Sequence, residues 1–350
     1  MIKTINAWRG IFAIVIVMFH SKVHLMDQAT YLGVSFFFVA SGFLLTMHHH
    51  DKDFTTFSSW WQFWWTRAKR IYLIHWLALA LFMALYLWVM NKPFKLPEFI
   101  SEFFLVHCWI PDKDFFFSFN SPSWFLGALL FHYACFPLIN KYYSRLHIYW
   151  QLLIMLLAIL VVAWLPTAIS GQMVTYTYVC PLVRLGDFLL GVTAANTCRI
   201  MSRTNLKYSA IKATIIELGV ILFALAVIFI DRTTKLVFLW SNHLIWWIPA
   251  LLITLTAVKL KGQEGFVGRI LTTRPFQFLG NISLEIYIFQ FIVAIFVNYF
   301  ISPIYGHFGH PIYDQYVWTQ LPLLILLSWG IYSLRHRISN RITTTASIHD

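Results

Sequence analysis

Two ionisable side chains, Arg9 and His20, lie eleven residues apart in one apolar run near the beginning of the chain. On a helix that rises ~1.5 Å per residue, about 16 Å separates them along the axis. A guanidinium group binds phosphate through paired hydrogen bonds, and a histidine can take a proton from a hydroxyl near neutral pH. The spacing therefore favours anion binding at one depth and proton transfer at another. The simpler alternatives are that Arg9 extends to the membrane interface and that headgroup water satisfies His20.

Further ionisable residues stand in later apolar runs, where such groups usually face a cavity or a partner. Arg184 and Asp187 are three residues apart, so they share a helix face. They can neutralise each other, or they can act at the depth of His20. Glu285 has a structural alternative, which is an ion pair with a basic residue of the preceding segment, Arg269 or Arg274.

The composition shows what kind of element must position these groups. Of the 350 residues, 59% are hydrophobic and 11% are charged, which is too few charges for a water-facing surface. The net charge of +12 lies in short segments between apolar runs, so it indicates membrane orientation and not a nucleic-acid partner. The four cysteines have no metal-like spacing, and the histidines at 48–50 lack further ligands, so no metal site is predicted.

Apolar runs of about 20 residues can cross the hydrocarbon layer as helices. The sequence predicts an all-α, polytopic membrane protein with about ten such helices. We place them at 5–23, 30–48, 71–90, 124–140, 148–166, 175–194, 213–230, 243–260, 282–300 and 317–334.

The distribution of Lys and Arg sets the expected topology. With ten spans, 18 of the 26 basic residues fall on the side of the termini and 6 on the other, while Arg9 and Arg184 lie inside spans. This asymmetry predicts that both termini are cytoplasmic. We expect a single domain over 1–340 and a disordered cytoplasmic tail over 341–350. The Trp-rich segment 49–70 is predicted as an interfacial helix, and the segment 91–122 as an interfacial helix or a lid.

Six short blocks of sequence occur in a fixed order along these spans. They are R-x10-H at Arg9 and His20, GVSFFFVASGFL at 33–44, RAKRIY at 67–72, SWFL at 123–126 with a proline thirteen residues after its Trp, PLVRLGDFLLG at 181–191, and LGNISLEIY at 279–287. Together they resemble the signature of the acyltransferase-3 family of membrane acyltransferases. The resemblance covers most of the chain, from residue 9 to about 293, and is closest to stand-alone, polysaccharide-modifying members.

The chain departs from the family pattern at three places. Leu129 and Leu130 stand where many members carry two glutamates, so no acid–base role is transferred there. Leu73 replaces the proline after the RxxRxY tyrosine, and Gln290 replaces a histidine three residues after the last tyrosine.

The resemblance implies transfer of an acyl group, most commonly acetyl, from cytoplasmic acyl-CoA (acetyl-CoA) to a hydroxyl of a glycan or lipid-linked saccharide beyond the other face. It also implies that the protein lies in the inner (plasma) membrane. His20 is then the expected general base, with Arg184 stabilising the oxyanion and Asp187 orienting either group. The expected donor-binding residues are Arg9, Arg67, Arg70, Tyr287 and Gln290. The expected acceptor-binding residues are Ser35 and Trp124.

Other functions fit a polytopic membrane protein with polar residues inside its spans. A transporter or flippase of a lipid-linked or small polar substrate is the main one, although paired halves with broken helices are not evident. A glycan polymerase or ligase would use a lipid-linked sugar and no CoA. A non-catalytic membrane subunit would tolerate the loss of His20.

Overall fold

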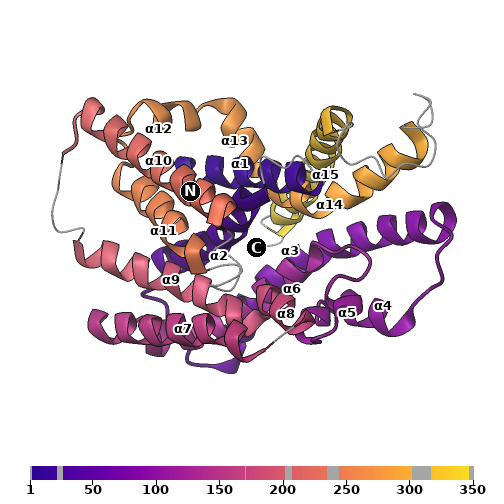
Figure 1. The fold of residues 1–350 in the computed structure, drawn as a ribbon, viewed down its shortest axis with the longest axis horizontal. Coiled ribbons are helices and arrows are strands. Elements are labelled where there is room, and N and C mark those ends of the chain that lie inside the picture. The colour runs from indigo at the N-terminus through magenta and orange to yellow at the C-terminus, as the bar shows by residue number, and fades with distance from the viewer. Residues whose placement is uncertain are drawn as a thin grey trace.

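The computed structural model describes residues 2–21, 27–169, 171–201, 207–234, 244–301 and 317–346. These residues form helices and connecting loops without a strand (Figure 1), which confirms the all-α prediction. The long helices are α1 (Lys3–His20), α2 (Asp27–His49), α3 (Phe57–Ala84), α6 (Ser123–Leu138), α7 (Ile148–Ala168), α9 (Pro181–Met201), α10 (Ala210–Thr234), α11 (Leu244–Lys259), α14 (Ser283–Phe296) and α15 (Val317–Ala346). The short ones are α4 (Leu96–Phe103), α5 (Lys113–Phe116), α8 (Gln172–Val179), α12 (Phe266–Leu271) and α13 (Arg274–Asn281), with η2 (Leu85–Val89), η3 (His107–Trp109), η4 (Ile139–Tyr143) and η7 (Val297–Ile301).

Within the described ranges, eight helical stretches are long and apolar enough to cross a membrane. Two of the ten predicted spans are not among them. The span at 243–260 corresponds to α11, which at 16 residues is short for a crossing. The first span corresponds to α1, whose opening turns carry polar residues that lower its hydropathy. The membrane class is confirmed, while the count of ten and the side of the termini stay predictions.

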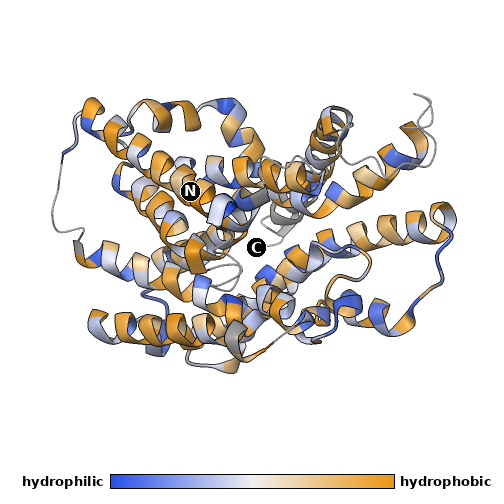
Figure 2. Ribbon diagram, viewed as in Figure 1, coloured by the Kyte–Doolittle hydropathy of each residue, from blue (hydrophilic) through white to orange (hydrophobic). Residues whose placement is uncertain are grey.

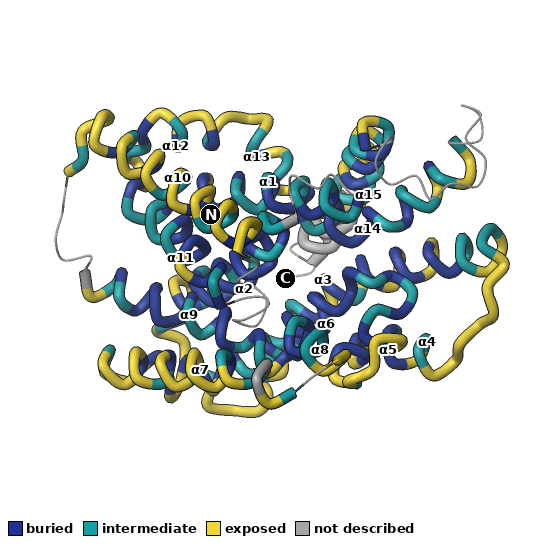
Figure 3. Tube along the Cα trace, viewed as in Figure 1, coloured by how far each residue is buried: buried dark blue, intermediate teal, exposed yellow. Residues whose placement is uncertain are grey.

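Helix α2 lies at the centre of the bundle and packs most extensively against α9. Glycines make this approach possible, because a Cβ atom on Gly42 would lie 2.1 Å from the carbonyl oxygen of Phe188, and one on Gly191 would lie 2.0 Å from that of Val39. In the span of α2, 72% of residues are buried, against 17% in α7 and in α10. Figure 3 shows the same contrast, and Figure 2 shows that α7 and α10 consist mostly of hydrophobic residues. Exposed side chains on these helices, such as Leu156 and Leu222, are apolar, as contact with lipid requires.

The first helix is held against the junction between α13 and α14. Gly10 and Gly280 meet there, and a Cβ atom on Gly10 would lie 2.7 Å from the backbone nitrogen of Gly280. The side chain of Asn6 donates to Oδ1 of Asn281 at 2.9 Å and so fixes the helix in register. Arg9, the neighbour of Gly10, is thereby placed beside the start of α14.

The Trp-rich segment predicted as a separate interfacial helix is continuous with the crossing helix that follows it. Helix α3 begins at Phe57, after a capping box between Thr56 and Ser59, and continues through η2 to Val89 as one stretch of 33 residues. Neither glycine nor proline interrupts it, so nothing separates an interfacial part from the crossing part. At ~1.5 Å per residue the stretch is about 50 Å long, which exceeds the ~30 Å hydrocarbon layer.

Two other predicted boundaries differ in the structure. The span at 175–194 is formed by α8 and α9, which are separated at Cys180 because Pro181 opens the second helix. Helix α15 continues to Ala346, into the segment predicted as a disordered tail, and residues 347–350 lie outside the described ranges.

The connection between α3 and α6, residues 90–122, folds into the short helices α4, η3 and α5. Side chains of α3 hold it: the hydroxyl of Tyr72 donates to the carbonyl oxygen of Phe104, and the indole of Trp76 donates to that of Phe103, each at 3.0 Å. Its last residues reach the end of α1 that carries His20.

Candidate active site: two cavities that share Tyr287

A cavity of about 480 Å³ opens where α1, α2, α3, α6, α14 and α15 meet, and we call it the arginine cavity. Four guanidinium groups line it, from Arg9, Arg67, Arg70 and Arg335. The structure thus brings together the three arginines predicted to bind the donor. Sequence reasoning missed Arg335, because that residue follows the last predicted span and was counted only as a topogenic charge.

The arginines of this cavity are held by specific partners. Arg67 donates to the carbonyl oxygen of Phe63 at 3.1 Å and lies 3.1 Å from Nε2 of His49. Arg335 forms an ion pair of 2.6 Å with Glu285, whose side chain is fully buried. Glu285 therefore pairs with Arg335 of α15. The partner expected from the sequence was Arg269 or Arg274, in the segment before α14.

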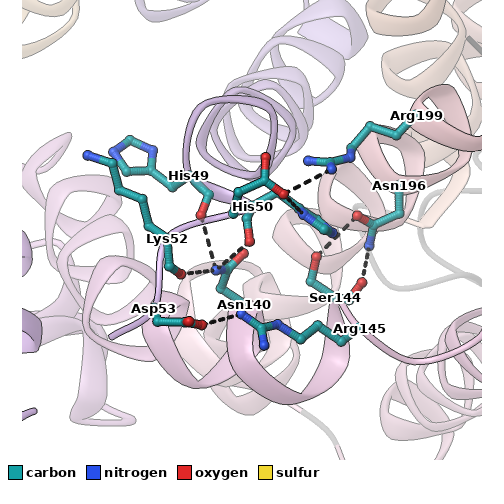
Figure 4. Close-up of polar contacts among 10 residues, drawn as sticks. His49, His50, Lys52, Asp53, Asn140, Ser144, Arg145, Asn196 and Arg199 are labelled. Atoms are coloured by element: carbon teal, nitrogen blue, oxygen red, sulfur yellow. Dashed lines mark hydrogen bonds and ion pairs between the residues drawn. The ribbon is translucent and has the colours of Figure 1, made fainter. Parts of the chain in front are cut away.

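The rim of the arginine cavity is tied down by a polar network at the end of α2 (Figure 4). The side-chain amide of Asn140 donates to the carbonyl oxygens of His49, His50 and Lys52 at 3.0–3.3 Å. Asp51 accepts from His50 at 2.8 Å and from Arg199 at 3.2 Å, and these contacts lower the pKa of its exposed carboxyl group. The network anchors the backbone of His49, which lines the cavity together with His48.

A second cavity, of about 340 Å³, lies at the other end of α1, and we call it the histidine cavity. His20 is in its wall, as the spacing from Arg9 predicts. Most of the remaining wall is aromatic or carries a hydroxyl group. These residues include Thr30, Tyr31, Phe117, Ser121, Trp124, Thr175, Tyr178, Tyr287 and Phe291.

The hydrogen bonds of His20 determine which ring nitrogen can act as a base. Its Nδ1 lies 2.9 Å from Oε1 of Gln290, and the amide nitrogen of Gln290 donates to the carbonyl oxygen of Tyr287 at 2.8 Å. Because Oε1 only accepts, Nδ1 of the neutral ring carries the proton. Nε2 is then left as the acceptor, which is the arrangement a general base needs.

Gln290 therefore lies elsewhere than predicted. It was expected in the donor channel, but it is not in the wall of the arginine cavity, because it stands nearly one turn beyond Tyr287 on α14, toward His20. Tyr287 itself lines both cavities and is 5% exposed. This one side chain forms a shared wall between the arginines and His20.

Three predicted site residues lie behind the histidine cavity. Arg184 and Asp187 are fully buried and form an ion pair of 3.5 Å. The guanidinium group of Arg184 lies 4.3 Å from the ring of Tyr178 and 5.8 Å from that of Trp124, both of which line the cavity. Ser35, also buried, lies 3.5 Å from that guanidinium group. The structure thus places these three residues in support of the wall, one layer away from His20.

Comparisons with known proteins agree with this architecture. A family model described as "Acyltransferase domain" matches residues 2–337. The chain is 27% identical over 183 residues to the acyltransferase MdmB of Streptomyces mycarofaciens, an alignment that covers 47% of this chain and 46% of that protein. The chain thus spans about half the length of this curated relative. No solved structure matches the chain.

The site and the fold describe a helical membrane protein with a cationic cavity and an aromatic cavity on either side of one tyrosine. The family match extends over nearly the whole chain. The chain belongs to the acyltransferase-3 family of membrane acyltransferases.

Proposed function

We propose that the protein transfers an acyl group, with acetyl as the first choice, from acyl-CoA in the arginine cavity to a glycan hydroxyl in the histidine cavity. The single observation that carries the proposal is that Tyr287 lines both cavities, so a thioester held by the arginines can reach the neighbourhood of His20.

The arginine cavity suits the donor's charged end. Arg9, Arg67 and Arg70 offer guanidinium donors that match phosphate oxygens, and Arg335, which is paired with Glu285, adds a fourth guanidinium group. No Asp or Glu is among the described residues that line the cavity. The volume of about 480 Å³ is within the range of small-molecule sites. The CoA phosphates would bind here, and the pantetheine arm would extend past Tyr287.

The chemical step uses His20 as the general base. Nε2 takes the proton of the acceptor hydroxyl as its oxygen forms a bond to the thioester carbonyl carbon. The tetrahedral oxyanion then collapses, the C–S bond breaks, and the CoA sulfur leaves with the proton returned by His20. The hydroxyls of Tyr178 and Tyr287, in the cavity wall, are the candidate oxyanion donors. Arg184 and Asp187 act as positioning residues behind Tyr178 and Trp124.

The acceptor follows from the wall of the histidine cavity. Aromatic rings offer apolar faces to the C–H groups of a sugar, while Thr30, Ser121 and Thr175 offer hydroxyl partners. We propose that this cavity faces the extracytoplasmic side of the inner membrane and that both termini are cytoplasmic, in line with the Lys and Arg distribution.

The test uses purified protein in lipid nanodiscs with acetyl-CoA labelled in the acetyl group and a panel of surface glycans and simple glycosides. We expect label transfer that is lost in His20→Ala and retained in the control His147→Ala, whose histidine is the exposed N-cap residue of α7 and lines neither cavity. His20→Ala should still bind acetyl-CoA. If wild-type protein binds no acyl-CoA, the donor assignment fails and a transporter becomes the better explanation.

A further inference from the structure

A third cavity, of about 400 Å³, lies next to the histidine cavity, and we call it the side cavity. It is built almost entirely from the connection between α3 and α6, and its wall includes Phe117, which also lines the histidine cavity. The remaining lining residues are Tyr86, Lys95, Glu98, Lys113, Asp114, Ser118 and Phe119. A ligand in one cavity therefore has a neighbouring space available across a single phenylalanine.

The wall of the side cavity includes a strained turn. Phe119 has φ of 34°, in the left-handed region that side chains other than glycine rarely adopt. Such a conformation is unfavourable and persists only where the surroundings enforce it. The strained residue separates the side cavity from the start of α6, so the strain lies where a ligand would be bound.

A buried carboxyl group enforces this turn. Glu102 is fully buried and accepts from Ser118 Oγ at 2.9 Å and from the backbone nitrogen of Asn120 at 3.2 Å, the two neighbours of Phe119. It also accepts from Ser123 Oγ at 3.0 Å, and Ser123 precedes Trp124 of the histidine cavity. One side chain thus fixes the walls of both cavities relative to each other.

The chemistry of the side cavity suits a sugar ring. Phe119 packs edge to face on Tyr86 with 5.1 Å between the ring centroids, and both rings line the side cavity, where they can contact the C–H face of a sugar. Lys95 pairs with Glu98 at 3.6 Å and with Asp114 at 3.7 Å. Such pairs place donors and acceptors side by side, as vicinal hydroxyls require. The charges of the two lysines and the two acidic residues in the lining cancel, which favours an uncharged sugar.

We propose that the side cavity is a second glycan subsite, which binds the uncharged sugar next to the one that is acylated. This proposal rests on the proposed function, because it assumes that the histidine cavity holds the acceptor hydroxyl. It makes the preferred acceptor an oligosaccharide and gives the connection between α3 and α6 a role in selecting it.

The experiment compares acceptors of different length in the nanodisc assay with labelled acetyl-CoA. The probes are methyl glycosides of glucose, galactose, mannose, rhamnose and N-acetylglucosamine, each with its matched homo-disaccharide and homo-trisaccharide. We expect kcat/KM at least 10-fold higher for the disaccharide than for the monosaccharide in the series that accepts label. The trisaccharide should add little.

Two variants test whether the side cavity causes the preference. Phe119→Gly removes the ring while keeping a residue that tolerates positive φ, and Lys113→Ala removes a polar lining group. We expect either variant to reduce the disaccharide preference to about 3-fold or less, with unchanged kcat/KM for the monosaccharide and unchanged KM for acetyl-CoA. Phe104→Ala, an exposed phenylalanine of the same connection that does not line the side cavity, is the control.

The outcomes separate the two proposals. Equal kcat/KM for mono- and disaccharides, or a preference that survives both substitutions, overturns the second subsite and leaves acyl transfer intact. Absence of label on every glycoside and surface glycan, with wild-type protein that is correctly folded, overturns both.

Discussion

The arginine cavity and the histidine cavity share one residue, Tyr287, but are otherwise lined by opposite chemistry. The first gathers four guanidinium groups from three helices, and the second presents His20 among aromatic rings and hydroxyls. Under the proposed function, one cavity binds the phosphates of the donor and the other accepts a proton. The difference teaches that a single helix, α1, can serve two tasks if it carries Arg9 toward one end and His20 at the other.

The largest effect should come from removing the base. His20→Asn should lower the rate of acyl transfer by about 10²–10⁴-fold, the usual contribution of a positioned general base. Acetyl-CoA affinity, measured by equilibrium binding in nanodiscs, should stay within about 2-fold of wild type. Loss of both activity and binding in this variant would show that the two cavities are not functionally separate.

The complementary change removes a phosphate-binding arginine. Arg9→Gln or Arg70→Gln should weaken acetyl-CoA binding by about 10- to 100-fold, since a hydrogen bond to a charged group contributes about 1.5–3 kcal/mol. S-acetyl-pantetheine, a donor without phosphates, is the control. If the arginines bind only the phosphates, wild type and variants should use this donor at equal rates. A similar loss with both donors would instead indicate a general structural defect.

A smaller effect is expected at the partner of the base. Gln290→Leu removes the acceptor for Nδ1 of His20 and lets the ring take either tautomer. We expect kcat to fall by about 10-fold, with KM for acetyl-CoA unchanged because Gln290 does not line the arginine cavity. Gln290→Asn, a shorter amide, is the matched variant. A rise in the KM for acetyl-CoA with constant kcat would instead support the predicted role of Gln290 in binding the donor.

The smallest effect concerns Glu102, the buried carboxyl group that holds the turn beside the side cavity, and the dependence of that turn on pH. Burial raises the pKa of Glu102 to about 8, so the folded state binds a proton that the unfolded chain has released. The resulting stability is complete below the ordinary pKa of about 4.5 and is lost as the pH rises through about 8. The pKa of the nearby His107 is lowered to about 3 by burial, so that ring stays neutral over this range.

Hydrogen exchange at the amides of residues 117–120 measures this effect. After correction for intrinsic rates, protection in the wild type should fall several-fold between pH 6.5 and pH 9. Glu102→Gln, which cannot ionise, should show the same protection at both values. A pH dependence that persists in this variant would assign the titration to another group.

The sequence predicted well those features that depend on a single continuous segment, such as the position of a residue along its helix. The ordered blocks placed Arg9, Arg67 and Arg70 in one cavity and His20 in another, because depth along a helix follows from residue spacing. The proposed roles of these residues stay predictions. The family assignment is confirmed, because it rests on the whole series of blocks.

What the sequence could not predict depends on contacts between distant helices. Arg335 and Glu285 are fifty positions apart, and only the packing of α15 on α14 shows that they pair. Helical rotation decides that Gln290 bonds to His20 and that Arg184 lies behind Tyr178 instead of beside the base. Hydropathy along one helix predicts how deep a residue lies in the membrane. It does not predict which neighbouring helix the side chain faces, because that depends on how the helices pack.

The shared wall at Tyr287 has a consequence for which chemical groups have to cross the bilayer. A protein that carried whole substrates would have to open first to one side and then to the other, as alternating access requires. Under the proposed reaction, the phosphates of CoA stay on one side and the sugar on the other. The pantetheine arm reaches past the tyrosine and withdraws, and only the acyl group remains on the far side. Cleavage of the thioester makes that passage directional, so neither an ion gradient nor a large rearrangement of the helices is required.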